Sequence, residues 1–221
     1  MTNPIIKRFY YQCIIIKKCM IKADVTKQEL QATVENLFDF IEKTMNEQGH
    51  FESMVQVDYL RNNRKGSFST FIDGNDSQKR YKDIVQLATI MGHYVNKKEI
   101  EAVRDIVMIS EAWFSSVNTG TKGNKYIPPS QDPNRKEAII CSAQNAKGDC
   151  ILKMREMVRV NITGTKKPFF RLENIREEKN WEAKSPLLDT FFVAYQAIIE
   201  SGIVLDENKI PFKIDFEAGQ K

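Results

Sequence analysis

A continuous apolar run, Ile106-Val107-Met108-Ile109, lies near the middle of this 221-residue sequence. Four apolar residues in succession, rather than an alternation with polar ones, indicate a central strand that is buried on both faces. The segment 114–134, which follows shortly afterwards, has no periodicity and is rich in Gly, Asn, Thr, Ser and Pro. We therefore expect a buried strand that leads into an unusually long loop, of a kind that is often functional or disordered.

Five further segments have the composition of strands, and turn residues separate them. Residues 62–66, Asn-Asn-Arg-Lys-Gly, are typical of a turn, so the strands on either side of them are expected to form a hairpin. Residues 144–149 predict the turn of a second hairpin in the same way. The predicted strands cover residues 54–60, 68–72, 136–143, 150–162 and 169–175.

The first helix has the clearest signals at both of its ends. Thr26 and Glu29 have the spacing of a capping box, in which each side chain accepts a hydrogen bond from the other residue's backbone. Apolar residues then recur at helical spacing until Gly49, which can end the helix. We expect this helix over about 27–47.

Two more helices are expected, one in the middle of the chain and one near its end. Residues 73–76 can cap a helix whose apolar residues recur over 81–95 at helical spacing. The residues that follow, 96–103, are interpreted as a short helical continuation after a break. Pro186 stands at a favoured first-turn position of the last helix, and Gly202 can end it.

These elements follow one another in the order α-β-β-α-β-β-β-β-α. Neither a regular βα alternation nor an internal repeat is present, which argues against doubly wound and solenoid folds. We therefore predict an α+β fold, with a largely antiparallel sheet and three main helices packed on it. Residues 1–19, which are basic and apolar, are interpreted as an N-terminal extension, and residues 20–221 as a single α+β domain.

Charge is distributed unevenly along the chain, although the formal net charge is +4. Residues 1–22 contain five of the 33 basic residues and none of the 29 acidic ones, so the remainder carries 28 minus 29, or −1. A neutral body argues against broad electrostatic binding of nucleic acid. Lys and Arg interrupt the apolar stretches near the N-terminus, so we expect neither export nor a membrane span, but a cytoplasmic protein.

The expected ligand-binding site consists of five residues around the long loop: Glu111, Trp113, Asp132, Arg135 and Glu137. The three carboxylates would meet at one end of the sheet if the strands that carry them are neighbours. Converging carboxylates can hold Mg²⁺ or act as acid and base. The alternative is a salt-bridge network of these charged residues and Lys136 that pins the loop. Arg135 is the expected organiser, because its planar guanidinium can hold a carboxylate or an anionic ligand.

A basic stripe is expected on the strand 150–162, where Lys153, Arg155 and Arg159 share one face. With aromatic residues nearby, such a stripe could bind single-stranded nucleic acid through charge and base stacking. The alternative, which we favour, is a solvated face whose charges are balanced by acidic residues such as Glu173.

The segments 109–113, Ile-Ser-Glu-Ala-Trp, and 129–138, Pro-Ser-Gln-Asp-Pro-Asn-Arg-Lys-Glu-Ala, resemble a pattern in uncharacterised bacterial and phage proteins. In those proteins a strand ending in Glu-Ala-Trp precedes a Pro-Ser-x-Asp-Pro-x-Arg-x-Glu segment and another strand. The resemblance extends loosely over residues 50–165. It implies a prokaryotic or mobile-element origin and carries no known activity.

The sequence favours a non-catalytic binding or accessory protein over an enzyme, because the body is neutral and no catalytic motif is recognisable. Residues 120–125 do not have the spacing of a phosphate-binding loop, and the Cys and His residues do not fit a zinc site. No cofactor or metal ligand is therefore assigned. Two alternatives stay open: a metal-dependent hydrolase or nuclease that uses Glu111, Asp132 and Glu137, and a single-stranded nucleic-acid binder. The partner is unknown; a protein is considered first, nucleic acid is not favoured and a membrane is not expected.

Overall fold

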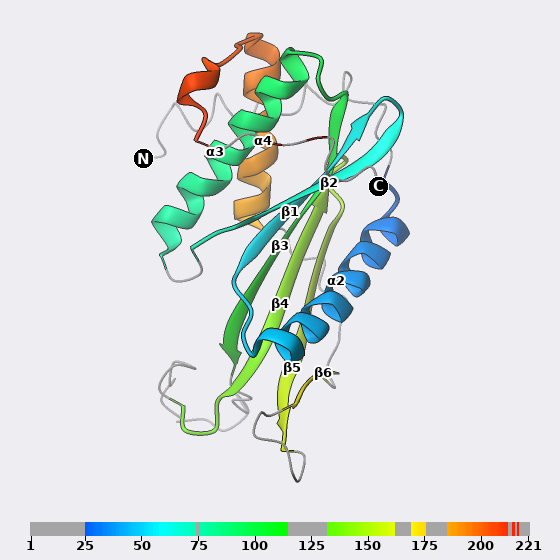
Figure 1. The fold of residues 1–221 in the computed structure, drawn as a ribbon, viewed down its shortest axis with the longest axis vertical. Helices are drawn as coiled ribbons and strands as arrows, with labels where there is room; N and C mark the ends of the chain where they lie inside the picture. The colour runs from blue at the N-terminus through cyan, green and yellow to red at the C-terminus, as the bar shows by residue number, and fades with distance from the viewer. Residues whose placement is uncertain are drawn as a thin grey trace, which may run out of the picture.

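The computed structural model describes residues 25–73, 76–114, 132–161, 169–175, 185–211, 214 and 216 (Figure 1). These residues form three α-helices and a six-stranded sheet with the strand order β2-β1-β3-β4-β5-β6. Every neighbouring pair of strands is antiparallel, so the predicted α+β fold is confirmed. The elements are α2 (Lys27–Gln48), β1 (Met54–Arg61), β2 (Arg64–Phe71), α3 (Ser77–Asn96), β3 (Ala102–Phe114), β4 (Lys136–Asn145), β5 (Cys150–Val160), β6 (Phe169–Asn174), α4 (Pro186–Ser201) and the 3₁₀ helix η3 (Glu207–Lys209).

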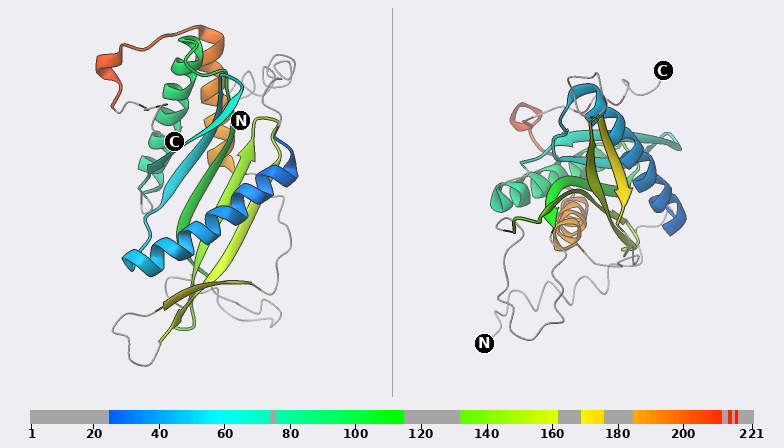
Figure 2. Two further views of the ribbon diagram at one scale, coloured as in Figure 1. Left: turned by 45° about the vertical axis from the view of Figure 1, so that its right-hand side comes forward. Right: turned by 90° about the horizontal axis from the view of Figure 1, so that it is seen from below.

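The sheet is curled and carries helices on both faces. Figure 2 shows α2 on one face and the pair α3 and α4 on the other. Side chains alternate between the faces along a strand, so Met54 belongs to the apolar cluster of α2, and the next residue, Val55, to that of α3 and α4. Val107 and Ile106 of β3 divide in the same way. The described residues therefore form two apolar cores, one on each side of the sheet.

Local sequence explains where α2 begins and ends. The Thr26 N–H donates to Glu29 Oε2 at 2.7 Å, and the Glu29 N–H donates to Thr26 Oγ1 at 3.2 Å, so the predicted capping box is present. Gly49 follows the last turn with φ 85°, a left-handed conformation that a residue without Cβ adopts at low cost. The buried side chains of α2 face β4, β5 and β6.

The first hairpin has a tighter turn than the predicted 62–66. Only Asn62 and Asn63 separate β1 from β2, and their φ values are 51° and 58°. Two successive residues with positive φ are typical of a type I′ turn, which suits the twist of a hairpin and which asparagine tolerates. Gly66 lies within β2 opposite Tyr59, whose ring occupies the space where a Cβ would stand. This glycine therefore reflects ring packing and not the turn.

β3 is 13 residues long and begins at Ala102, so the predicted helical continuation over 96–103 is wrong. After α3 the chain reverses at Lys98, which has φ 61°. Val103 is instead a buried strand residue whose N–H donates to Tyr195 Oη at 2.9 Å. Val103 is apolar because it packs against α4, a contact that requires a strand and not a helix at this position.

The last helix packs on the sheet, as predicted for the three main helices. Phe191 and Tyr195 are 0% exposed, whereas Ile198 is only partly buried. The two helices on this face approach closely at Gly92 of α3, where an added Cβ would lie 2.7 Å from Ile198 Cγ2. α4 is thus part of the core of the described structure.

Several expectations concern residues outside the described ranges. The interpretation of residues 1–19 as an extension stays a prediction, as does the single domain over 20–221. Residues 115–131, which make up most of the predicted long loop, also lie outside these ranges. No helix in the described part of the chain is long and apolar enough to cross a membrane.

Candidate binding site

Two neighbouring strands bring three of the predicted site residues to one end of the sheet. β3 pairs with β4 so that Trp113 lies opposite Glu137, and Glu111 lies opposite Ile139. Residues two apart on a strand share a face. Because Ile139 packs in the α2 cluster, Glu111, Trp113 and Glu137 lie on the face that carries α2.

Arg135 stacks on Trp113. Its guanidinium carbon lies 3.8 Å from the centroid of the indole ring, which is within the range of a cation–π contact. The Trp113 side chain is 48% exposed, and Arg135 is exposed as well. The pair therefore presents an aromatic ring and a guanidinium together to the solvent.

Asp132 forms the turn that leads to Arg135. Its Oδ1 accepts the N–H of Asn134 at 2.8 Å, and its carbonyl oxygen accepts the N–H of Arg135 at 3.1 Å. Among the described residues, no three His, Cys, Asp or Glu side chains form a group that could hold a metal ion. The contacts of Asp132 thus prepare the entry to β4, from which Arg135 reaches Trp113.

The first two residues of β4 form ion pairs with β5, on opposite faces of the sheet. Arg159 Nη2 lies 2.7 Å from Glu137 Oε2, and Lys136 Nζ lies 2.8 Å from Glu156 Oε2. Two members of the alternative salt-bridge network, Lys136 and Glu137, are thus paired with β5. Such exposed pairs typically contribute only about 0–1 kcal/mol, so their main effect here is to orient the side chains.

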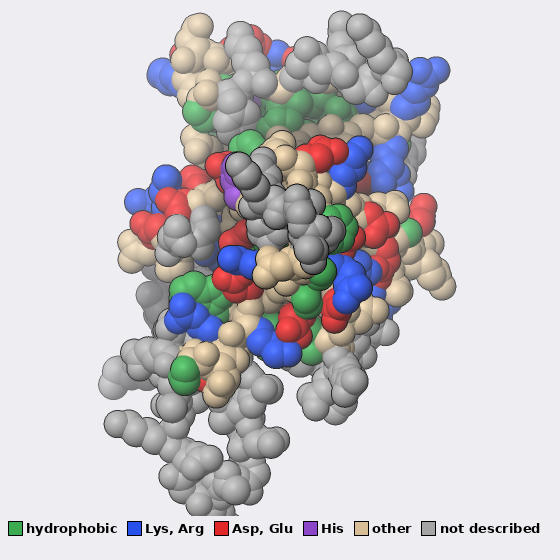
Figure 3. Space-filling view, turned by 60° about the horizontal axis from the view of Figure 1, so that its bottom comes forward, with side chains coloured by type: hydrophobic (Ala, Val, Ile, Leu, Met, Phe, Trp, Pro, Cys, Tyr) green, Lys and Arg blue, Asp and Glu red, His purple; other side chains and the backbone are tan. Residues whose placement is uncertain are grey.

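The carboxyl group of Glu111 lies in a field of mixed charge. Partial burial raises the pKa of Glu111 above its ordinary value and Glu137 raises it further, whereas Arg159 and His50 lower it. Figure 3 shows this end of the molecule, where acidic and basic side chains are interspersed with hydrophobic ones. We call the exposed group at this end of the sheet the Trp113 surface: Glu111, Trp113, Arg135, Glu137 and Arg159.

The predicted basic stripe is divided between two environments. Lys153 and Arg155 both bind Glu35 of α2, and their side chains are 12% and 16% exposed. The guanidinium of Arg155 also lies over the ring of Phe38, 4.6 Å from its centroid. Arg159, which is 58% exposed, is the member of the stripe that joins the Trp113 surface.

A buried pair of acids is present that the sequence interpretation did not single out. Asp58 of β1 and Asp105 of β3 are partners in the strand register, and each is 1% exposed. Lys65 Nζ lies 2.7 Å from Asp58 Oδ2, and Gln56 Nε2 donates to Asp58 Oδ1 at 2.9 Å. Burial raises the pKa of Asp105 to about 7, and Asp58 contributes to the rise, whereas Lys65 and Arg104 oppose it. The available signal was an aspartate within each of two strands that are otherwise largely apolar.

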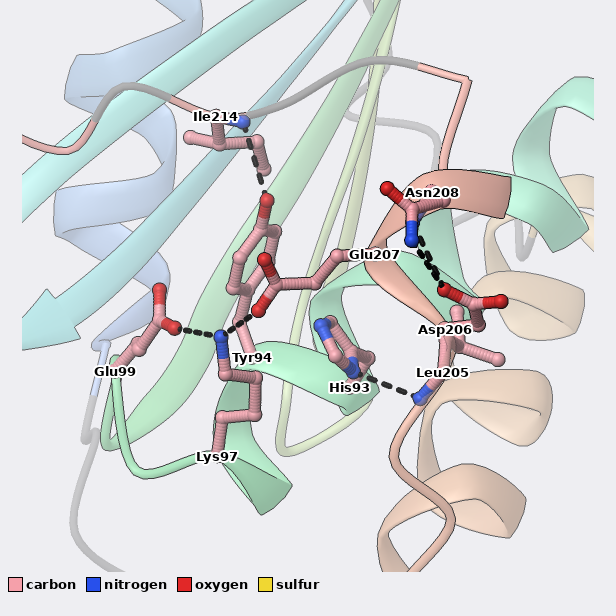
Figure 4. A network of polar contacts seen from close by, with 9 residues as sticks. All are labelled: His93, Tyr94, Lys97, Glu99, Leu205, Asp206, Glu207, Asn208 and Ile214. Atoms are coloured by element: carbon pink, nitrogen blue, oxygen red, sulfur yellow. Dashed lines mark hydrogen bonds and ion pairs between the residues drawn. The ribbon is translucent and has the colours of Figure 1, made fainter.

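His93 has no obvious partner in the sequence, but in α3 it anchors the chain that follows α4. His93 is fully buried, and its Nδ1 accepts the N–H of Leu205 at 3.0 Å. One turn later, Lys97 lies between the carboxylates of Glu99 and Glu207 (Figure 4). These contacts hold the C-terminal segment on α3.

Fold and site together define an α+β protein in which a curled antiparallel sheet separates one helix from a pair of helices and carries an exposed Trp–Arg stack at one end. The chain belongs to the family described as bacteriophage lambda protein ea47, because the family model matches residues 8–189. No curated protein and no solved structure matches the chain. A phage family agrees with the expected resemblance to uncharacterised bacterial and phage proteins.

Proposed function

We propose that this phage-family chain is a non-catalytic binding protein that contacts a protein partner through the Trp113 surface. The observation that supports this most directly is the stack of Arg135 on the half-exposed ring of Trp113. Tryptophan and arginine are the residue types that most often dominate the energy of protein–protein binding. The stack also limits the freedom of both side chains before binding, which lowers the entropy lost when a partner docks.

The charges of the surface favour a protein partner over nucleic acid. Binding to a phosphate backbone requires several basic side chains that are available together. Here Lys153 and Arg155 are bound to Glu35 beneath α2, and Arg159 is bound to Glu137. Interspersed acids and bases instead suit a partner with a complementary mixture of charges, which is common between proteins.

The test compares the wild-type chain with Trp113→Ala and with a matched control, Phe71→Ala. The Phe71 ring is 69% exposed at the end of the edge strand β2, so its removal also deletes an exposed aromatic group. Each tagged chain is purified from cells infected by a phage that encodes it, and retained proteins are identified by mass spectrometry. Binding of a purified candidate partner is then measured by calorimetry.

We expect Trp113→Ala to weaken binding by at least about 30-fold, which corresponds to about 2 kcal/mol, while Phe71→Ala binds as the wild type does. Arg135→Lys keeps the charge but loses the planar stack, so its affinity should lie between the two. Circular dichroism checks that each variant is folded. A partner that binds Trp113→Ala as tightly as the wild type would rule out this surface.

The same proteins distinguish the two alternatives. Salt-dependent binding of a single-stranded oligonucleotide that is lost in Arg159→Ala would favour the nucleic-acid binder. Hydrolysis that requires Mg²⁺ and is lost in Glu111→Gln would favour the metal-dependent enzyme. We expect neither activity in the wild-type chain.

A further inference from the structure

We propose that Asp58 and Asp105 share a single proton in the folded protein, and that this acid pair is a pH-sensitive switch that holds the N-terminal end of α2 on the sheet. The two residues are opposite one another on β1 and β3, directly beside a shift in the strand register. Each is 1% exposed, so bulk solvent does not hydrate either carboxyl group while the protein is folded.

Among the described residues, three of the four carboxyl oxygens of the pair have no hydrogen-bond partner: Asp58 Oδ2 and both oxygens of Asp105. Gln56 Nε2 donates to Asp58 Oδ1 at 2.9 Å, and Lys65 Nζ forms an ion pair with Asp58 Oδ2 at 2.7 Å. A proton on Asp105 removes its charge and supplies a donor toward Asp58, which makes burial of both groups tolerable.

The charges around the pair also indicate that one of the two acids is protonated. Glu29 of α2 and Arg104 of β3 face Asp105, and they compensate each other because Glu29 Oε1 lies 3.8 Å from Arg104 Nη2. The remaining positive group is the ammonium of Lys65, and one ammonium balances one carboxylate. The second carboxylate therefore keeps its proton, which agrees with the upward direction of the pKa of Asp105.

The pair is connected to α2 through its neighbour in the sheet. Asn145 of β4 is the register partner of Asp105, and its amide nitrogen donates to the carbonyl of Val25 at 2.9 Å and to Asp149 at 2.8 Å. This amide thus ties Val25, the residue before the N-cap of α2, to β4 beside the acid pair. Loss of the shared proton places a second negative charge near Glu29, and water can relieve the repulsion only if this end of α2 separates from the sheet.

The direction of the effect follows from the raised pKa of Asp105. The stability that the shared proton contributes is complete below the pKa of an unfolded aspartate, about 4. It is lost as the pH rises through the folded value of about 7. Within this window, each pH unit should lower the folding equilibrium constant by about tenfold relative to a chain without the switch.

The first test is a titration of the wild-type chain with ¹³C-labelled aspartate carboxyl groups, followed by NMR. We expect one carboxyl of the pair to titrate near the value of about 7 that the buried environment of Asp105 produces. Two carboxyl groups that both titrate at about 4 would overturn the shared proton. This measurement needs no variant, so it stands even if substitutions in the core prevent folding.

The second test uses Asp105→Asn, whose amide has the shape of the protonated acid. The matched control is Asp189→Asn, which removes a carboxylate on the other face of the sheet that accepts a hydrogen bond from Gln144. We expect urea unfolding of the wild type and of Asp189→Asn to show the loss of stability between about pH 5 and 7, and Asp105→Asn not to show it. Hydrogen exchange is corrected for its intrinsic pH dependence. Above about pH 7, the first turn of α2 should lose protection in the wild type but not in Asp105→Asn. The same pH dependence in Asp105→Asn, or unchanged protection of α2 while the carboxyl titrates, would overturn the switch.

Discussion

The side chain of Asn46 holds the backbone of Phe170 as a neighbouring strand would. Asn46 Nδ2 donates to the Phe170 carbonyl at 2.8 Å, and the Phe170 N–H donates to Asn46 Oδ1 at 2.7 Å. Glu42, one turn earlier in α2, accepts the N–H of Leu172 at 2.7 Å. α2 thus covers the outer edge of the short strand β6 and satisfies backbone groups that would otherwise be available for pairing with another chain.

Asn46→Ala should therefore destabilise the protein by about 1–3 kcal/mol, because it leaves a partly buried donor and acceptor without partners. The control is Thr44→Ala, which removes a hydroxyl that donates to Phe40 O within α2. Urea unfolding measures the change, and hydrogen exchange should show lost protection in β6 for Asn46→Ala but not for Thr44→Ala. If both variants protect β6 equally, the edge does not depend on this amide.

Phe191 is the most informative position for testing whether α4 is a core helix. The ring is 0% exposed and lies edge-on to Phe192, with 5.3 Å between the ring centroids. Phe191→Ala should cost about 3–5 kcal/mol in urea unfolding. Val193→Ala, at a position that is 42% exposed on the same helix, should change stability by less than about 0.5 kcal/mol. Unchanged stability of Phe191→Ala together with altered self-association would instead identify an interface.

Gly92 tests how closely α3 and α4 are packed. Alanine is the better helix former by about 1 kcal/mol, so propensity alone predicts that Gly92→Ala stabilises the protein. Its Cβ would, however, lie 2.7 Å from Ile198 Cγ2 and 3.2 Å from the Tyr195 carbonyl oxygen. We expect the clash to prevail and to cost about 1–3 kcal/mol in thermal or urea unfolding. The double variant Gly92→Ala/Ile198→Ala should fit the extra methyl group better than Gly92→Ala does; an additive loss would contradict this explanation.

The sequence predicted those parts of the fold that depend on neighbouring residues. The capping box of Thr26 and Glu29 is a local signal, so the start of α2 was located correctly. The element order and the sheet type followed from the spacing of apolar residues. The start of β3 was missed because Val103 is buried by contacts with α4, which lies far away in the sequence. The turn of the first hairpin was overestimated because Gly66 makes room for Tyr59, a contact that only the strand register creates.

The proximity of the candidate residues was predictable only in part. Glu111, Trp113 and Glu137 could be placed together only on the condition that the strands on either side of one connection are neighbours, and β3 does pair with β4. The coverage of Lys153 and Arg155 by α2 could not be read from the sequence, because it depends on which face of the sheet the helix covers. The contact between Asp58 and Asp105 likewise requires the register of β1 on β3.

The contact between His93 and Leu205 should make the anchoring of the C-terminal segment sensitive to acid. Nδ1 of His93 accepts the N–H of Leu205, which requires that this nitrogen carry no proton. Burial lowers the pKa of His93 and Lys97 lowers it further, whereas Glu99 and Glu207 act in the opposite direction. Because the folded pKa is lowered, the contribution of this contact is present above the unfolded value of about 6.5 and is lost as the pH falls below it.

The measurement is NMR-detected hydrogen exchange of the Leu205 amide, because global stability also contains the opposite contribution of Asp105. We expect protection of this amide to fall as the pH falls below about 6.5 in the wild type. His93→Gln offers an acceptor that does not titrate, so its Leu205 amide should keep the same protection over this range. The Gly202 amide, which donates to Ile199 O at 3.1 Å at the end of α4, serves as the internal reference. Protection of Leu205 that stays constant in the wild type, or that falls equally in His93→Gln, would show that the segment is held by its other contacts and not by the imidazole.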